Sequence, residues 1–243
     1  MRGIRALGFG VWALFAAGAL AAQDQDARKV ADRPLATREE LQAALSSAGG
    51  ASEVAMRIKS RLSDGDFRRG DRIALMVQAE STLSDTFVVG NGPELILPPP
   101  TTGSMSLKGV LRSELQSKMT EYIGRFKNNP IVRAQPLLRI SVQGEVAKAG
   151  IYGVPADAQL ADALMAAGGT TQFAKPNNVT IERNGKAFWH GSAFDTDLDA
   201  LALRDGDQIV VDSKRPGGID ALRVTAMLVG IAVGLYSLSR AMH

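Results

Sequence analysis

Two short segments that contain aspartate are the first places in this sequence where metal chemistry could occur. Gly70-Asp71 and Asp205-Gly206-Asp207 carry carboxylates of the kind that bind divalent cations, but each comes just before an expected strand. Calcium takes six or more oxygen ligands, and the sequence has no loop of the DxDxDG type. Because turns also prefer glycine and aspartate, both segments are predicted to be turns, and no metal site is expected.

Aromatic and polar side chains in the second half of the chain could contact a ligand. Phe188 and Trp189 could stack on a sugar ring, although core packing is the more ordinary role of such residues. His190 has no cluster of cysteine, histidine or carboxylate beside it, which is typical of a surface residue. Trp189 is therefore a candidate sugar contact, whereas Glu145, which follows Gly144, is expected to cap or pair structurally.

No catalytic motif is present in the sequence. It has no Ser/His/Asp set with a nucleophile elbow, no P-loop and no GxGxxG after a strand. It has two histidines and no cysteine, so acid–base groups are scarce and thiol nucleophiles, thiolate ligands and disulfides are excluded. We predict no enzymatic activity, no catalytic residue and no cofactor.

Composition limits the partners and the number of domains. The chain has 243 residues, of which 45% are hydrophobic, enough for one or two domains with real cores. A net charge of +3, without a basic stretch rich in aromatic residues, does not indicate a nucleic-acid-binding protein.

The N-terminus has the pattern of a secretory signal peptide. Arg2 and Arg5 precede an uncharged run over residues 6–22, and Ala19-Leu20-Ala21 offers a cleavage site with small residues. We predict a signal peptide over 1–22, with an uncleaved anchor helix as the alternative. No cysteine follows the run, which excludes acylation as a lipoprotein.

A second apolar segment near the C-terminus predicts a transmembrane helix over residues 219–241. A bilayer core of about 30 Å requires about 20 helical residues, so the segment is just long enough. Ala226, Gly230 and Gly234 form a stripe of small residues at a spacing of four, which would let helices pack closely in lipid.

The charges beside this segment bear on which membrane it enters. Lys214, Arg215 and Arg223 precede it, whereas only Arg240 and His243 follow it. Positive residues concentrate on the cytoplasmic side of inner-membrane helices. The distribution therefore disfavours an inner-membrane helix with a cytoplasmic tail.

Residues 23–64 are predicted to be helical. Thr37 and Glu40 form a capping-box pattern before an apolar run. Gly49-Gly50 separates this helix from a second amphipathic run over residues 53–62. The segment has no motif of its own, and a packing or spacer role is expected.

Residues 65–137 are predicted to form a small α/β domain. Turn and strand patterns occupy 67–77, 86–89 and 94–98, and a new strand begins near 131. A helix is expected over residues 107–126. One face of it holds Val110, Leu111, Leu115, Met119, Tyr122 and Ile123.

Residues 138–213 are predicted to form a sheet wrapped on one helix, the β-grasp arrangement. Strands are expected before Gly144 and over 151–154, 178–183, 187–189 and 209–211. The helix between them carries Leu160, Ala163, Leu164 and Ala167 on one face. Asp157 is its expected N-cap, Gly168-Gly169 its stop, and Asn184-Gly185 a hairpin turn.

The motifs SVQGEV, AGIYGVP, VTIERNG and DGDQIVV follow one another across residues 139–212. In residue types and order they resemble the SLBB (soluble-ligand-binding β-grasp) domain. Upstream, RRGDRI, TFVVGNGPELILP and NNPIVRAQPLLRI resemble the polysaccharide export domain. Together with a signal peptide and a C-terminal membrane helix, this order resembles the outer-membrane polysaccharide export family, with an α+β fold.

The resemblance implies a translocon in the periplasm and outer membrane. Such proteins form ring-shaped homo-oligomers, with an octamer implied here, that thread an extracellular polysaccharide outward. Their partner is an inner-membrane polysaccharide copolymerase or tyrosine kinase, and their C-terminal helices form a barrel through the membrane. Residues 226–236 are apolar nearly all round, so whether this helix forms a pore or only an anchor stays open. A membrane-tethered SLBB module that binds a glycan or another soluble ligand is the alternative.

Overall fold

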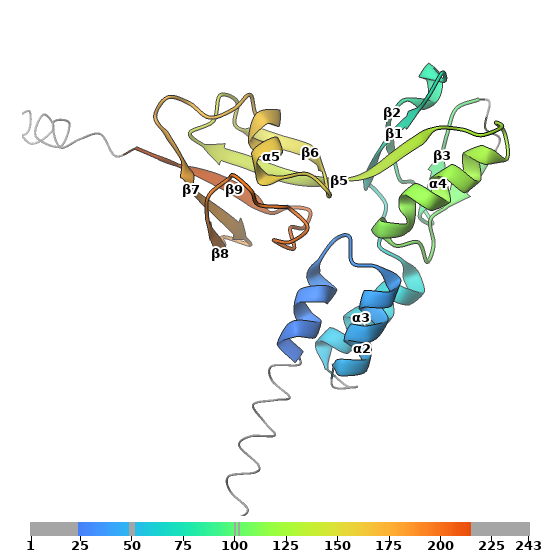
Figure 1. Cartoon of the computed structure of the whole chain (residues 1–243), viewed down its shortest axis with the longest axis horizontal. Coiled ribbons are helices and arrows are strands. Elements are labelled where there is room, and N and C mark those ends of the chain that lie inside the picture. The colour runs from blue at the N-terminus through green and yellow to red at the C-terminus, as the bar shows by residue number, and fades with distance from the viewer. Residues whose placement is uncertain (1–23, 49–51, 100, 102, 215–243) are drawn as a thin grey trace, which may run out of the picture.

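The computed structural model describes residues 24–48, 52–99, 101 and 103–214 of a mixed α+β chain (Figure 1). Within these ranges, no helix is both long and apolar enough to cross a bilayer. The predicted signal peptide and C-terminal helix, with Ala226, Gly230 and Gly234, lie outside the described residues.

A helical unit comes first. Residues 24–32 are helical, and α2 (Arg38–Ser47) and α3 (Glu53–Asp64) follow. The predicted capping box is confirmed, because Glu40 N donates to Thr37 Oγ1 at 3.2 Å and Thr37 N donates to Glu40 Oε2 at 2.8 Å. The core of this unit consists mainly of small or aliphatic side chains: Ala27, Ala31, Ala36, Leu41, Ala44, Ala48, Val54, Ala55 and Ile58.

A middle unit packs short strands against one helix. Its elements are β1 (Arg72–Val77), η1 (Ser81–Leu83), β2 (Asp85–Val88), β3 (Glu94–Ile96), β4 (Ser104–Ser106), η2 (Arg112–Glu114) and α4 (Leu115–Gly124). β1 pairs with β2 on one side, and β3 pairs with β4 in a separate small sheet.

The helix expected over residues 107–126 is shorter than predicted. Gly109 has a φ of 73°, and Leu111 is extended, so regular α-helix begins only at Leu115. The expected apolar face is nevertheless buried throughout. Leu111 packs into the core of the helical unit rather than the middle unit, which explains why its backbone leaves the helical path.

One long strand, β5 (Val132–Gly144), joins the middle unit to the third unit (Figure 1). Its residues 132–137 pair with β1, residues 137–142 with β6 (Gly150–Pro155), and residues 141–144 run parallel to β9 (Gln208–Ser213). The two strands predicted near 131 and before Gly144 are therefore one, and the expected boundary at 137/138 lies inside it.

The third unit completes the main sheet in the order β2-β1-β5-β9-β7-β8. α5 (Leu160–Ala166) follows β6, and β7 (Ala174–Arg183) and β8 (Lys186–Gly191) form the hairpin at the far edge. The predicted apolar face of α5 is confirmed, because all its members are buried in one core with the strands: Leu160, Ala163, Leu164 and Ala167.

The turns of the third unit follow the glycine and asparagine signals, with one correction. Asn184-Gly185 has positive φ angles of 52° and 73°, as a tight hairpin requires. Asp157 is not the N-cap of α5: Gln159 holds that position, and its N–H donates to Asp162 Oδ2 at 2.9 Å. A turn closed by Ala158 N and Pro155 O places Asp157 before the cap, where it accepts from Gln135.

Candidate functional site

The loop before β9 closes a gap in the main sheet. Arg139 lies between the stretch of β5 that pairs with β1 and the stretch that pairs with β9. Its N–H donates to Asp205 Oδ1 at 2.7 Å, and its carbonyl accepts from Gly206 N at 2.8 Å. The segment Asp205-Gly206-Asp207 thus continues the hydrogen bonding of β5 between the residues paired with β1 and those paired with β9, and the predicted turn has a structural role.

Ion pairs connect this loop to both other units. Arg112 Nη2 lies 2.9 Å from Asp205 Oδ2, and Arg112 N donates to Asp66 Oδ2 at 3.0 Å. Arg61 of α3 holds Asp66 with two bonds, of 2.7 and 2.9 Å. Since Arg61, Arg112 and Asp205 belong to the helical, middle and third units, the three units meet at one charged junction.

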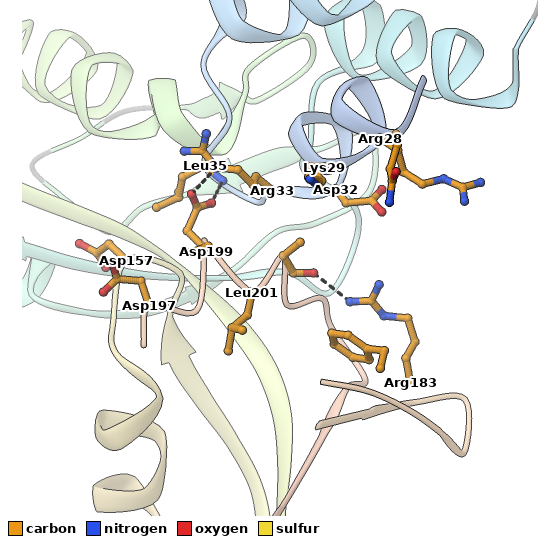
Figure 2. Close-up of a pocket in the computed structure, with 14 residues that line it drawn as sticks. Arg28, Lys29, Asp32, Arg33, Leu35, Asp157, Arg183, Asp197, Asp199 and Leu201 are labelled. Carbon is orange, nitrogen blue, oxygen red and sulfur yellow. Dashed lines mark hydrogen bonds and ion pairs between the residues drawn. The ribbon is translucent and has the colours of Figure 1, made fainter. Parts of the chain in front are cut away.

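A groove of about 990 Å³ lies beside this junction, between the N-terminal helical residues and the third unit (Figure 2). Arg33 Nε donates to Asp199 Oδ2 at 2.8 Å, and Leu35 N donates to the other oxygen of Asp199 at 2.6 Å. These two bonds join the N-terminal helical unit to the third unit at the groove. Its lining comprises Gln25, Arg28, Lys29, Asp32, Arg33, Leu35, Asp157, Arg183, Phe188, Asp197, Asp199, Ala200, Leu201 and Ala202.

One wall of the groove combines an aromatic ring with a guanidinium group. The Arg183 Cζ atom lies 4.6 Å from the centroid of the Phe188 ring, a cation–π arrangement, and Phe188 is 43% exposed. Asp207, which is almost fully buried, fixes this arginine through bonds of 2.8 Å to Nε and 2.7 Å to Nη2. Carboxylates, guanidinium groups and an exposed ring suit a polar ligand with an apolar face, such as a sugar.

Electrostatics favour the charged forms of most groove arginines. The hydrogen bond to Asp199 raises the pKa of Arg33 above its ordinary value, although burial opposes this. The bonds to Asp207 raise the pKa of Arg183 in the same way. Burial lowers the pKa of Arg204, the charges of Arg183 and Arg57 lower it further, and the ion pair with Asp32 opposes the shift.

Around Asp71, burial is the largest effect. It raises the pKa of this carboxyl above its usual value, while the Arg68 N–H and the Arg112 charge oppose the shift. For Arg112, burial works to lower the pKa, but the charge and hydrogen bond of Asp205 outweigh it, and the pKa is raised. No group of three or more potential metal ligands occurs in the part of the chain that the structure describes.

The two aromatic residues singled out in the sequence face opposite sides of β8. Trp189 pairs with Ile181 and is half-buried against the third unit's core, whereas Phe188 lines the groove. This follows from the alternation of side chains along a strand. Sugar contact by Trp189 stays a prediction. Glu145 accepts from Thr171 Oγ1 at 2.6 Å, and His190 lies beside Thr180 on the surface.

Several groove residues carry no signal in the sequence. Arg33 and Asp199 are 166 positions apart, and neither lies in a motif. Arg183 precedes the Asn184-Gly185 turn, so its position at the end of a strand was predictable, but its pairing with Asp207 was not. Only the fold brings these charges together.

Comparison with known families covers part of the third unit. Residues 139–192 match the model of the SLBB domain. The match includes β6, α5 and β8, and ends before β9, which the sheet places between β5 and β7. No curated protein matches the chain.

Proposed function

We propose that this chain is a non-enzymatic component of a translocon that exports a capsular polysaccharide or exopolysaccharide. The observation that carries the proposal is the SLBB domain at residues 139–192, which the uninterrupted strand β5 joins to a unit whose sequence resembles a polysaccharide export domain. A continuous strand couples the two units, as a protomer that lines a channel requires.

The distribution of exposed apolar side chains supports a ring. A head-to-tail ring needs two different surfaces on each copy, which contact each other in neighbouring protomers. Large apolar side chains are exposed on the middle unit at Ile96, and on the third unit at Met165, Phe173 and Phe194. Residues of this kind become buried when protomers associate.

We also propose where the protein acts and which partners it has. The chain would enter the periplasm through its signal peptide and reach the outer membrane, with residues 219–241 as a pore helix or an anchor. An inner-membrane copolymerase or tyrosine kinase would feed polymer into a ring of identical subunits, an octamer by resemblance. No cofactor takes part.

The groove supports a second candidate function. The groove, of about 990 Å³, has the size of a site for a small molecule and lies between two units of one protomer. On this alternative, the protein is a membrane-tethered monomer whose SLBB domain and N-terminal helical residues bind a glycan or another soluble ligand.

Molar mass separates the two candidates. The full-length protein is extracted from outer membranes in mild detergent, and its mass is corrected for bound detergent. The translocon predicts a discrete mass many times that of the monomer. Ile96→Arg and Phe173→Arg should each reduce this mass, whereas Met56→Arg, an equally exposed change on α3, should not. A monomer, or recovery only from inner membranes, would contradict the translocon and favour the tethered module.

A further inference from the structure

A second hollow, of about 400 Å³, lies where β1, β5 and β6 meet. It is separate from the groove of Figure 2, since the two share no lining residue. Three arginines surround it: Arg69 and Arg72 at the start of β1, and Arg139 on β5. From β6, the exposed residue Ile151 and Gly153, which is opposite Arg139, line the hollow.

The three guanidinium groups have no side-chain partner. Among the described residues, neither a hydrogen bond nor an ion pair involves the side chains of Arg69, Arg72 or Arg139. The two carboxylates in the hollow are already occupied. Asp71 accepts from Arg68 N at 2.9 Å, and Asp205 accepts from Arg112 and from the backbone of Arg139. The hollow therefore presents unpaired positive charge.

Positive charge is also present farther along β5, on the face of the sheet that points away from the core. Ile73, Leu75 and Val77 are buried in the core with α4, so Arg72, Ala74 and Met76 face the other way. On that open face, Leu137 is opposite Arg72 and Arg133 is opposite Met76. Within the described part of the chain, Arg133 also has no side-chain partner, and it borders a neighbouring hollow of about 450 Å³ with Gln135, Thr86 and Asp85.

We call Arg69, Arg72, Arg133 and Arg139 the arginine track. Arg133 and Arg139 are six residues apart in one strand, which corresponds to about 20 Å. Between them lie Ala74 and Gln135, whose amide group binds the Asp157 carboxylate, and Gly153 lies opposite Arg139. The track is thus an open, extended surface, and its shape suits a polymer better than a single small ligand.

We propose that the arginine track binds the carboxylate groups of an acidic polysaccharide, of the uronic acid class. The inference rests on the proposed function and names the substrate class of the exported polymer. A guanidinium fork holds a carboxylate with two parallel hydrogen bonds. Ile151 of β6, which is 60% exposed and lines the hollow, supplies an apolar contact for a sugar. Several weak contacts along one chain add up through effective concentration.

Binding of defined oligosaccharides tests this inference. Full-length protein in detergent is titrated with oligogalacturonate and with a neutral dextran of equal length, at fixed ionic strength. The wild type should bind oligogalacturonate and not dextran. Arg72→Gln/Arg139→Gln should weaken binding by about tenfold, because two forks are lost. Arg72→Lys/Arg139→Lys should fall between the two, since lysine keeps the charge without the fork.

Lys59→Gln/Lys186→Gln is the matched control. It removes the same charge from two exposed side chains that have no partner among the described residues and lie outside the track, and it should change affinity less than twofold. An equal loss in the track and control variants, or equal binding of dextran, would overturn the inference, as would tighter binding of single-stranded DNA of similar charge. The molar mass measured on the same samples distinguishes failure of this inference from failure of the translocon proposal. A large oligomer that does not prefer oligogalacturonate would refute only binding by the arginine track. A monomer that does prefer oligogalacturonate would refute only the translocon.

Discussion

Asp207 is the residue on which the local structure of the third unit depends most. Its carboxylate accepts three bonds, two from the Arg183 side chain and one from Arg204 N at 2.8 Å. Its backbone carbonyl also accepts from Ser141 N at 3.0 Å, which starts the parallel pairing of β5 and β9. One buried side chain therefore connects a turn, the end of β7 and the groove wall.

We predict that Asp207→Ala destabilises the protein by about 3 kcal/mol, because it leaves a partly buried guanidinium group and a backbone N–H without their acceptor. Urea unfolding measures this change. Glu39→Ala is the control, since Glu39 is an exposed carboxylate on α2 without a partner in the described chain. It should change stability by less than about 0.5 kcal/mol. Equal effects of the two substitutions would refute the structural role of Asp207.

At the scale of elements, the end of β5 depends on a single glycine. Gly144 has a φ of 84°, and a Cβ added there would lie 2.2 Å from Val211 O. The chain can leave the sheet at this point only because the residue has no side chain, and this lets Glu145 N donate to Val211 O at 3.0 Å. The parallel contact between β5 and β9 ends in this close approach.

Gly144→Ala should therefore destabilise the third unit by about 3 kcal/mol or more, through positive φ and overlap with the backbone of β9. Thermal unfolding followed by circular dichroism measures it. Gly124→Ala provides the comparison, because nothing lies within 4 Å of the added atom at the end of α4. That change should be neutral or stabilising by up to about 1 kcal/mol. A stable Gly144→Ala protein would contradict the close approach.

At the scale of the whole molecule, ion pairs rather than a shared apolar core join the helical unit to the others. Arg38 of α2 holds Glu114 of η2 with two bonds, of 2.7 and 3.0 Å. Arg33 reaches Asp199 in the third unit at 2.8 Å. Leu111 is the one described residue of the middle unit in the helical unit's buried core. We therefore expect the contacts between the units to depend on pH.

Stability should fall in acid for this reason. The Arg38 hydrogen bond lowers the pKa of Glu114, and the Thr37 N–H lowers the pKa of Glu40. A carboxylate whose folded pKa is depressed contributes its full stability above the unfolded value, about 4.3 for glutamate. That contribution is lost as the pH falls through the folded pKa. The free energy of unfolding should thus decrease below about pH 4.3.

Arg38→Met tests this origin of the acid sensitivity. The substitution removes the largest cause of the Glu114 shift, so the slope of stability against pH between about 5 and 3 should become shallower. Lys59→Met removes an exposed charge on α3 that has no partner in the described ranges, and it should leave the slope unchanged. An unaltered slope in Arg38→Met would assign the acid sensitivity to other carboxyls.

The sequence predicted those elements whose signals are local. The capping box at Thr37, the apolar face of α5 and the turn at Asn184-Gly185 were all predicted correctly, because each depends on residues within one or two turns of the chain. The N-cap at Asp157 and the start of the helix before Leu115 were wrong. In both places the backbone follows a tertiary requirement: a turn closed on Pro155, and the packing of Leu111 into another unit.

The sequence by itself determined the SLBB domain, the strand and turn pattern, and which residues form the cores. These features depend on hydrophobic periodicity and turn residues, which are properties of neighbouring positions in the chain. Only the tertiary structure decided that two expected strands are the single strand β5, and that Asp205 closes its gap. It also decided that Arg33 meets Asp199, and that the arginines of the track share one face. Contacts between residues far apart in sequence depend on the register and pairing of strands. A side chain's charge gives no information about which distant partner the completed sheet will place beside it.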